Sequence, residues 1–333
     1  MIFSVIGAGS WGTSLAEILA ENNFDVTLYA RSEQVCDEIN NNHSNNKYFP
    51  FEIDLDKKVK ATSNLNQAVS QADAIVLSVP SAQYRNVLTE IVKYLQHKVI
   101  IVSTAKGFDP ETSERLSEVI KEIVPKEKIK ASMSLIGPSH AEEVIQKLFT
   151  CVSVVGSDEK QLKIIQQAFS NNYFRVYTNT DEVGAEYAAA LKNVIAIASG
   201  IMTGLGYGVN TRAALITRGL AEMTRFGMAM GGKMETYLGL SGLGDLMVTC
   251  TSKFSRNFQA GLKIGHDDSA QDFLIHNNKT VEGVKTARVM HDKALQAHIE
   301  MPITDAVYAV LFLDEKPSNV AKTLINRALK PEF

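Results

Sequence analysis

The chain has 333 residues, of which 45% are hydrophobic and 21% charged, and its formal net charge is -3. This is the composition of a folded globular protein, and the length favours two domains over one. The 34 basic and 37 acidic residues are interspersed without a basic stripe, which argues against a nucleic-acid-binding protein and against a polybasic membrane anchor.

No segment of the sequence predicts export or membrane insertion. The N-terminal apolar run lacks a preceding basic region, and the most apolar long stretch, residues 188–205, contains Lys192 and several other polar residues. The three cysteines are widely spaced without a C-x-x-C pair, and the seven histidines show no metal-binding spacing. We therefore expect a cytoplasmic protein without a metal.

Short β-branched runs alternate with amphipathic helical segments through the first half of the chain. The expected strands are Phe3–Gly7, Asp25–Ala30, Ala74–Val79, Val99–Thr104, Met133–Gly137 and Cys151–Gly156. Such alternation predicts an α/β fold with a doubly wound parallel sheet. The Asn-rich segment 40–58 is expected to be a loop or an irregular excursion at the sheet edge, and no role is assigned to it.

Beyond residue 180 the strand patterns fade, and helical patterns rich in Ala, Leu and Met continue to about residue 329. We therefore expect a sheet domain of residues 1–180 followed by an all-helical domain of residues 181–333.

A G-x-G-x-x-G motif occupies residues 7–12, directly after the first expected strand and before a helical pattern that starts at Thr13. In this position it predicts the phosphate-binding turn of a Rossmann dinucleotide-binding unit. Gly7 allows the tight turn, Gly9 lets the backbone approach a pyrophosphate, and Gly12 permits close helix packing. The alternative is a glycine-rich turn without a ligand, which the flanking strand and helix disfavour.

The second expected strand ends without the acidic residue that holds the ribose hydroxyls in NAD-selective enzymes. Arg31 follows it instead. Because a guanidinium suits a 2′-phosphate, the sequence favours NADP as at least an accepted cofactor. A solvated arginine after the strand is the alternative.

Lys192 is the only charged residue between Tyr187 and Thr211. It has no acidic partner four residues away on its expected helix, so it either extends to water or lines a cleft. A partly desolvated ammonium exchanges a proton more readily near neutral pH, which favours the catalytic interpretation.

Two polar segments follow in the second half. Asp245 comes after a glycine-rich run in apolar company, where it could hold Lys192, contact a substrate hydroxyl, or cap a helix. Ser255, Arg256 and Asn257 begin another expected helix, and a guanidinium beside helix N-terminal amides is suited to bind a phosphate. A serine-capped helix with a surface arginine is the alternative for this segment.

Lys106 follows the expected strand Val99–Thr104, and Gly137 and Ser139 follow the strand that ends at Ile136. Open α/β sheets bind ligands at the carboxyl ends of their strands, so we expect these residues to face cofactor or substrate. The alternative for Lys106 is a solvent-facing loop lysine.

Several motifs occur in a specific order and spacing, and together they resemble the bacterial-type NAD(P)-dependent glycerol-3-phosphate dehydrogenase family over nearly the whole chain. The motifs are Gly7-Ala8-Gly9-Ser10-Trp11-Gly12-Thr13, Lys106-Gly107, Gly137-Pro138-Ser139, Leu191-Lys192-Asn193-Val194, Gly242-Leu243-Gly244-Asp245-Leu246, Ser255-Arg256-Asn257 and Val281-Glu282-Gly283. The resemblance implies a Rossmann domain followed by a helical domain.

The resemblance also implies roles for individual residues. Lys192 is implied as proton donor and acceptor, assisted by Asp245, Asn193 and Thr249. The residues implied for the substrate are Lys106, Gly137, Ser139, Lys192, Asp245, Ser255, Arg256 and Asn257. Those implied for NADP or NAD are Gly7, Gly9, Ser10, Trp11, Gly12, Arg31, Lys106, Ala141, Arg256, Thr280 and Glu282, with Thr280 contributing its backbone.

The implied reaction is the reversible reduction of dihydroxyacetone phosphate to sn-glycerol 3-phosphate. The resemblance also implies that the enzyme is a homodimer and that its product supplies glycerophospholipid synthesis. Related β-hydroxyacid dehydrogenases and ketopantoate reductase are alternatives, and they recognise carboxylates rather than phosphate. A redox sensor that binds NAD(P) without turnover is a third.

Overall fold

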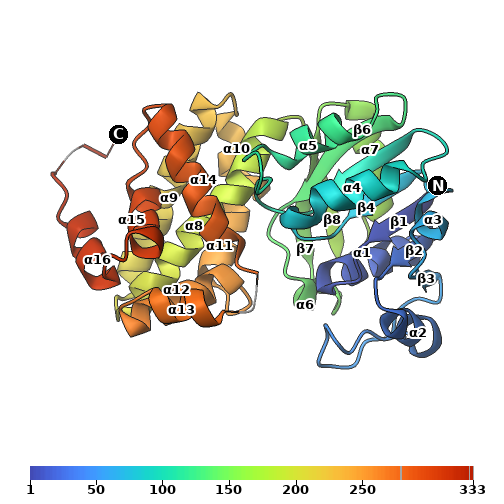
Figure 1. Ribbon diagram of the computed structural model, residues 1–333, viewed down its shortest axis with the longest axis horizontal. Coiled ribbons are helices and arrows are strands. Elements are labelled where there is room, and N and C mark those ends of the chain that lie inside the picture. The colour runs from blue at the N-terminus through green and yellow to red at the C-terminus, as the bar shows by residue number, and fades with distance from the viewer. Residues whose placement is uncertain (278–279, 330, 333) are drawn as a thin grey trace. The chain divides into compact units, whose positions relative to one another are not determined.

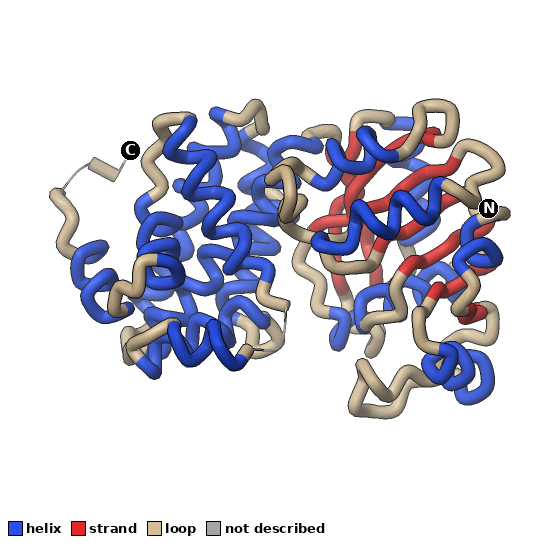
Figure 2. The backbone as a smooth tube through the Cα atoms, viewed as in Figure 1, coloured by secondary structure: helices blue, strands red, loops and turns tan. Residues whose placement is uncertain are grey.

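The computed structural model describes residues 1–277, 280–329 and 331–332. The chain divides into two compact units, Met1–Glu186 and Tyr187–Phe333 (Figure 1). The strands lie in the first unit, and the described part of the second contains only helices and loops (Figure 2).

The first unit is built around one eight-stranded sheet with the strand order β3-β2-β1-β4-β5-β6-β7-β8. All neighbouring strands pair in parallel except β6 and β7, which are antiparallel. The strands are β1 (Ile2–Ile6), β2 (Asp25–Tyr29), β3 (Val59–Thr62), β4 (Ala74–Leu77), β5 (Val99–Ser103), β6 (Ile129–Ile136), β7 (Thr150–Gly156) and β8 (Phe174–Asn179). The order of the first six strands is that of the Rossmann fold, which confirms the predicted fold class.

Helices cover both faces of this sheet (Figure 1). They are α1 (Ser10–Glu21), α2 (Glu33–Asn42), α3 (Leu65–Val69), the 3-10 turn η1 (Ser81–Gln83), α4 (Tyr84–Val92), α5 (Leu116–Ile123), α6 (Ala141–Val144) and α7 (Glu159–Phe169). Alternate residues of β1 enter different cores: Phe3 and Val5 pack with α1, whereas Ile6 packs with Leu88 of α4. A parallel sheet buried on both faces explains why its strands are continuous apolar runs.

The structure differs from the expected strand set in two respects. Strands β3 and β8 were not predicted, because each lies at an edge of the sheet and buries only alternate residues, which leaves a weak apolar signal. Strand β7 runs antiparallel to β6, although a parallel sheet was expected. The four-residue helix α6 rises only about 6 Å, so it cannot carry the chain back along the eight residues of β6.

The second unit is helical. Its elements are α8 (Glu182–Gly204), which begins before the division, α9 (Val209–Ala229), α10 (Met234–Leu238), the π-helical turn η2 (Leu240–Gly244), α11 (Asp245–Thr251), α12 (Arg256–Asp267), α13 (Gln271–His276), α14 (Glu282–Gln296), α15 (Pro302–Phe312) and α16 (Pro317–Ile325). Residues 188–202 of α8 are all buried, as expected for a largely apolar helix that forms the centre of a core. In the described residues no helix is both long and apolar enough to cross a membrane.

Helices α8 and α12 pack closely at glycine residues. A Cβ atom added to Gly200 would lie 2.2 Å from the carbonyl oxygen of Phe258, and one added to Gly261 would lie 2.1 Å from that of Ile197. Side chains larger than hydrogen would therefore push the two helices apart. This contact holds the N-terminal turn of α12, with Asn257, next to Asn193 of α8.

Candidate active site

The glycine-rich turn connects β1 to α1, as predicted. Gly7 has a φ of 112°, and a Cβ atom there would lie 2.5 Å from the carbonyl oxygen of Ser78; one on Gly12 would lie 1.9 Å from the carbonyl oxygen of Gly7. Both positions therefore need glycine for the fold itself. Gly9 differs, because a Cβ atom added there would have no protein atom within 4 Å, so the protein's own packing does not require a glycine. Open space in front of this backbone fits the close approach of a phosphate group.

The start of α1 is tied to the start of α6. The Ser14 hydroxyl lies 3.0 Å from the carbonyl oxygen of Ser10 and 3.2 Å from that of Ala141. The Trp11 ring is partly buried and lies 6.4 Å from the Phe174 ring. Three residues expected at the cofactor, Ser10, Trp11 and Ala141, thus lie around one helix N-terminus.

Arg31 follows β2 and is exposed. Its guanidinium forms no hydrogen bond or ion pair with any residue of the described part of the chain. An arginine that the fold does not engage remains available to an anionic ligand, although the same observation fits a solvated surface residue.

Lys106, Gly137 and Ser139 come together at the carboxyl ends of β5 and β6. The Lys106 Nζ and the Ser139 Oγ both donate to the carbonyl oxygen of Gly137, each at 3.1 Å. Gly137 has a φ of 154°, and a Cβ atom there would lie 2.9 Å from the Cα of Val152. Two donors therefore surround one sterically required glycine at the edge where ligands of such sheets bind.

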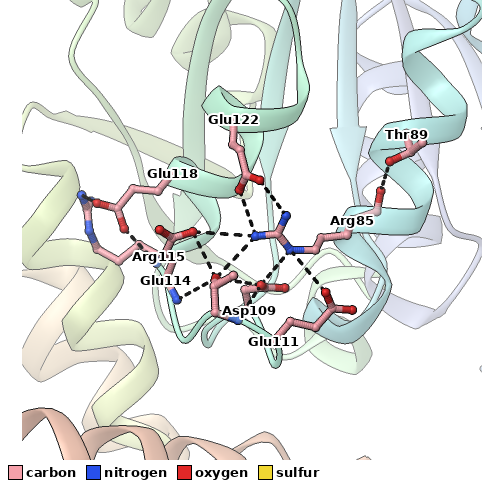
Figure 3. Close-up of polar contacts among 9 residues, drawn as sticks. Arg85, Thr89, Asp109, Glu111, Glu114, Arg115, Glu118 and Glu122 are labelled. Carbon is pink, nitrogen blue, oxygen red and sulfur yellow. Dashed lines mark hydrogen bonds and ion pairs between the residues drawn. The ribbon is translucent and has the colours of Figure 1, made fainter.

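Sequence reasoning missed the ion-pair network that anchors the segment after Lys106 (Figure 3). Arg85 of α4 donates from Nε to Asp109 at 2.8 Å and makes a two-point contact with Glu122 at 3.0 and 2.9 Å. Burial alone would raise the pKa of Asp109, but Arg85 and the hydrogen bonds from Thr112 outweigh it and hold that pKa below its usual value. No sequence signal distinguishes Arg85 from an ordinary surface arginine, since its partners are distant in the chain.

In the second unit, Lys192 is buried and engaged on two sides. Its Nζ lies 2.6 Å from Asp245 Oδ1 and donates to Thr249 Oγ1 at 2.7 Å. The residues are 4%, 1% and 5% exposed, so the ammonium does not extend to water. Asp245 starts α11 directly after the π-helical turn η2, a departure from regular geometry that is often found at functional sites.

Cys250, next in the chain to Thr249, is buried beside this ion pair. Burial raises the pKa of its thiol to about 12, against an opposing effect of Lys192. The group therefore stays a neutral thiol, and it offers no nucleophile to the site.

A chain of hydrogen bonds extends from the neighbouring residue, Asn193. Its Oδ1 accepts from Asn257 Nδ2 at 2.9 Å, and Asn257 Oδ1 accepts from the backbone N–H of Gly283 at 2.9 Å. A Cβ atom on Gly283 would lie 2.7 Å from both Asn193 O and Asn257 Oδ1. Asn257, expected at the substrate, thus also links the starts of α12 and α14 to α8.

The remaining expected residues lie at helix starts. Ser255 caps α12, because its Oγ accepts from the backbone N–H of Phe258 at 3.2 Å. Arg256 is exposed, and none of the described residues forms a hydrogen bond or ion pair with it. Glu282 begins α14 and is partly buried, and Thr280 before it is exposed. The capped helix that was weighed as the alternative is present, and it leaves the guanidinium available.

Comparison with known proteins identifies the family of this chain. The family model for the N-terminal part of NAD-dependent glycerol-3-phosphate dehydrogenase matches residues 3–162, and the model for the C-terminal part matches residues 181–322. The glycerol-3-phosphate dehydrogenase (NAD(P)+) of Listeria innocua is 44% identical over 329 residues, which cover 99% of this chain and 97% of that protein.

Solved structures point to the same family. The glycerol-3-phosphate dehydrogenase of Coxiella burnetii is 35% identical and superimposes with a TM-score of 0.90, covering 98% of each chain. That of Saccharomyces cerevisiae is 27% identical, with a TM-score of 0.85 over 97% of this chain and 99% of the other. The chain therefore belongs to the NAD-dependent glycerol-3-phosphate dehydrogenase family.

Proposed function

We propose that the protein catalyses the reversible reduction of dihydroxyacetone phosphate to sn-glycerol 3-phosphate with NADPH or NADH. Family membership supports this reaction. The single observation that carries the mechanism is the buried Lys192, whose ammonium is held by Asp245 and Thr249. When bound, the cofactor supplies the hydride, and reduction of the ketone requires a proton at its oxygen.

Lys192 is the proposed donor of that proton. An ammonium group is a donor only, and its Nζ lies within hydrogen-bond distance of oxygens of Asp245 and Thr249. These two residues restrict the position of Nζ without removing its charge, and a positioned ammonium stabilises the alkoxide that develops in the transition state. Asn193 is proposed to assist from the adjacent position on α8.

The phosphate is proposed to bind at the start of α12. Ser255 caps this helix, Arg256 has an unengaged guanidinium, and backbone N–H groups at a helix start attract anions. Asn257, Lys106, Gly137 and Ser139 are proposed as further substrate contacts.

Cofactor binding is proposed for the first domain, residues 1–180, and catalysis for residues 181–333. The open space at Gly9 and the N-terminus of α1 support pyrophosphate binding there, with Gly7, Ser10, Trp11 and Gly12. Arg31 supports acceptance of NADP, since no acidic residue follows β2. The further proposed contacts are Lys106, Ala141, Arg256, Thr280 and Glu282.

We further propose a cytoplasmic homodimer that supplies glycerol 3-phosphate for glycerophospholipid synthesis. Family membership supports this assignment, and the three free cysteines Cys36, Cys151 and Cys250 suit a reducing compartment.

Steady-state oxidation of NADPH and NADH tests the proposal. We expect turnover with dihydroxyacetone phosphate and little with ketopantoate or with the keto form of a β-hydroxyacid, because those substrates offer a carboxylate in place of the phosphate. Tight NADPH binding without turnover on any triose phosphate would favour the sensor and contradict the enzyme.

A further inference from the structure

The excursion between α2 and β3, residues 43–58, reaches back to the glycine-rich turn through one side chain. Asn45 is 0% exposed. Its Nδ2 donates to the backbone carbonyl of Ala8 at 3.1 Å and to the Thr13 hydroxyl at 2.9 Å. An amide NH2 group has two hydrogens, so both are used, one on each side of Gly9.

Hydrogen bonds made by the two neighbouring residues, Ser44 and Asn46, fix the position of Asn45. The Glu38 carboxylate of α2 accepts from the Ser44 hydroxyl at 3.0 Å and from the Asn46 backbone N–H at 2.7 Å. The carbonyl oxygen of Asn45 accepts from the backbone N–H of Phe49, whose ring is fully buried. The position of the amide is therefore determined by the excursion and not by the turn that it contacts.

The orientation of the amide is also determined. Turning it over would place Oδ1 against the carbonyl oxygen of Ala8, where two acceptors repel. In the observed orientation Oδ1 is buried and has no hydrogen-bond partner in the described part of the chain. An unpaired buried acceptor destabilises a fold. The observed orientation has this cost, and it preserves the two hydrogen bonds that Nδ2 donates.

The contact with Ala8 controls the direction of the next N–H. In a planar trans peptide the carbonyl and the following N–H point in opposite directions. Because the Ala8 carbonyl points to Asn45, the Gly9 N–H points away from it, and a Cβ atom added to Gly9 would meet no protein atom within 4 Å. The second contact, to Thr13, fixes the first turn of α1, where the backbone N–H of Thr13 donates to the Gly9 carbonyl at 2.9 Å.

We propose that Asn45 is a positioning residue for dinucleotide binding, which holds the Ala8–Gly9 peptide in the orientation that presents the Gly9 N–H to the cofactor pyrophosphate. The inference rests on the proposed function, in which this turn binds NAD(P). The proposal assigns a role to the Asn-rich excursion, for which the sequence predicted none.

Asn45→Asp tests this role, because it keeps the shape of the side chain and replaces the two N–H donors by a carboxyl group, which has one donor when protonated and none when ionised. Asn40 supplies a matched control. It lies at the start of the same Asn-rich segment, donates from Nδ2 to the Ala61 carbonyl at 2.9 Å and accepts from the Ala61 N–H at 2.8 Å, but it contacts strand β3 and not the turn. Each variant is characterised by NADPH titration, by thermal unfolding without cofactor, and by KM for dihydroxyacetone phosphate and kcat at saturating NADPH.

We expect Asn45→Asp to raise the Kd for NADPH about tenfold, as the loss of at least one of the two hydrogen bonds predicts, while KM for dihydroxyacetone phosphate and kcat stay near wild type. Asn40→Asp should lower the Tm and leave the Kd unchanged. An unchanged Kd in folded Asn45→Asp, or an equal rise in Asn40→Asp, would overturn the proposal.

Thr13→Val decides the question if Asn45→Asp does not fold. It is similar in volume and removes only the acceptor of the second contact, so a rise in Kd of a few-fold is expected and an unchanged Kd would contradict the role of Asn45. Wild-type protein that binds neither NADPH nor NADH would instead refute the proposed function, which distinguishes the two failures.

Discussion

The two units prepare their parts of the site by different means. In the first unit the expected ligand contacts are backbone groups and loop residues that follow strand ends, such as Gly9 and Lys106. In the second they are side chains on helices, and Lys192 meets partners 53 and 57 residues away in the chain. The conformation of the glycine-rich turn follows largely from adjacent residues, with Asn45 as a distant contact, whereas a buried side-chain cluster depends wholly on helix packing.

The buried carboxyl groups of the two units also have different kinds of partner. Asp245 in the second unit is paired with an ammonium at 2.6 Å. Glu17 in the first is 4% exposed, and its Oε2 accepts from the backbone N–H of Asp56 at 2.8 Å. One buried acid thus serves a proposed reaction, and the other attaches the Asn-rich excursion to α1.

Loss of Lys192 should have the largest effect. Lys192→Met should lower kcat by roughly 10²-fold or more, because a positioned general acid is lost, while the Kd for NADPH changes little, since the proposed cofactor contacts lie mainly in the first unit. Steady-state kinetics and NADPH titration measure the two quantities.

The control for Lys192→Met addresses the charge that it leaves behind. Asp245 would remain buried without its cation, which destabilises the fold. Combining Lys192→Met with Asp245→Asn should restore thermal stability and leave kcat low. Near-normal turnover in either variant would refute the catalytic role of Lys192.

Ionisation of the buried Glu17 in the first unit should make the free energy of unfolding depend on pH. Burial, reinforced by the nearby Glu21 carboxylate, raises its pKa from 4.5 to about 7 in the folded protein. Between these values the folded state keeps a proton that the unfolded state has lost, so stability is full below about pH 4.5 and falls as pH rises to about 7. The loss from this group should be at most about 3.5 kcal/mol, at about 1.4 kcal/mol per pKa unit.

Glu17→Gln keeps the acceptor for the Asp56 N–H and removes the titration. Urea unfolding at about pH 5 and about pH 8 should show a smaller decline in the free energy of unfolding than in wild type. Equal declines in both proteins would show that Glu17 ionises at an ordinary pKa.

Arg256→Lys separates geometry from charge in the second unit. The exposed guanidinium has no partner in the described residues, and an ammonium cannot reproduce its bidentate contact with phosphate. We expect a penalty of about 1.5–3 kcal/mol in kcat/KM for dihydroxyacetone phosphate.

Unphosphorylated dihydroxyacetone at constant ionic strength provides the comparison for Arg256. A penalty confined to the phosphorylated substrate supports the phosphate contact. Equal penalties on both substrates would assign Arg256 to the cofactor or to the scaffold.

The smallest effect is expected from Arg31→Asp in the first unit. An acidic side chain repels a 2′-phosphate and accepts hydrogen bonds from ribose hydroxyls, so the ratio of kcat/KM for NADH over NADPH should rise about tenfold, which corresponds to one lost charge-assisted contact. An unchanged ratio would show that the exposed Arg31 points away from the cofactor.

Much of the fold was predictable because its signals are local. Continuous apolar runs marked the buried central strands, and the G-x-G-x-x-G motif marked the turn between β1 and α1. Edge strands β3 and β8 were not predicted, because about half of their residues face away from the core. The antiparallel direction of β7 was not predicted either, because a strand's direction depends on the path of the chain between strands.

For the candidate site, the sequence by itself determined which residue types are present and which lie next to one another: the glycine turn, an isolated Lys192, and the Ser255-Arg256-Asn257 run. Only the tertiary structure decided that Lys192 meets Asp245 and Thr249, that Asn257 bridges to Gly283, and that Asn45 reaches the glycine-rich turn. The reason is physical. Hydrogen bonds depend on distances of about 3 Å, and for residues far apart in the chain these distances are set by how helices and strands pack.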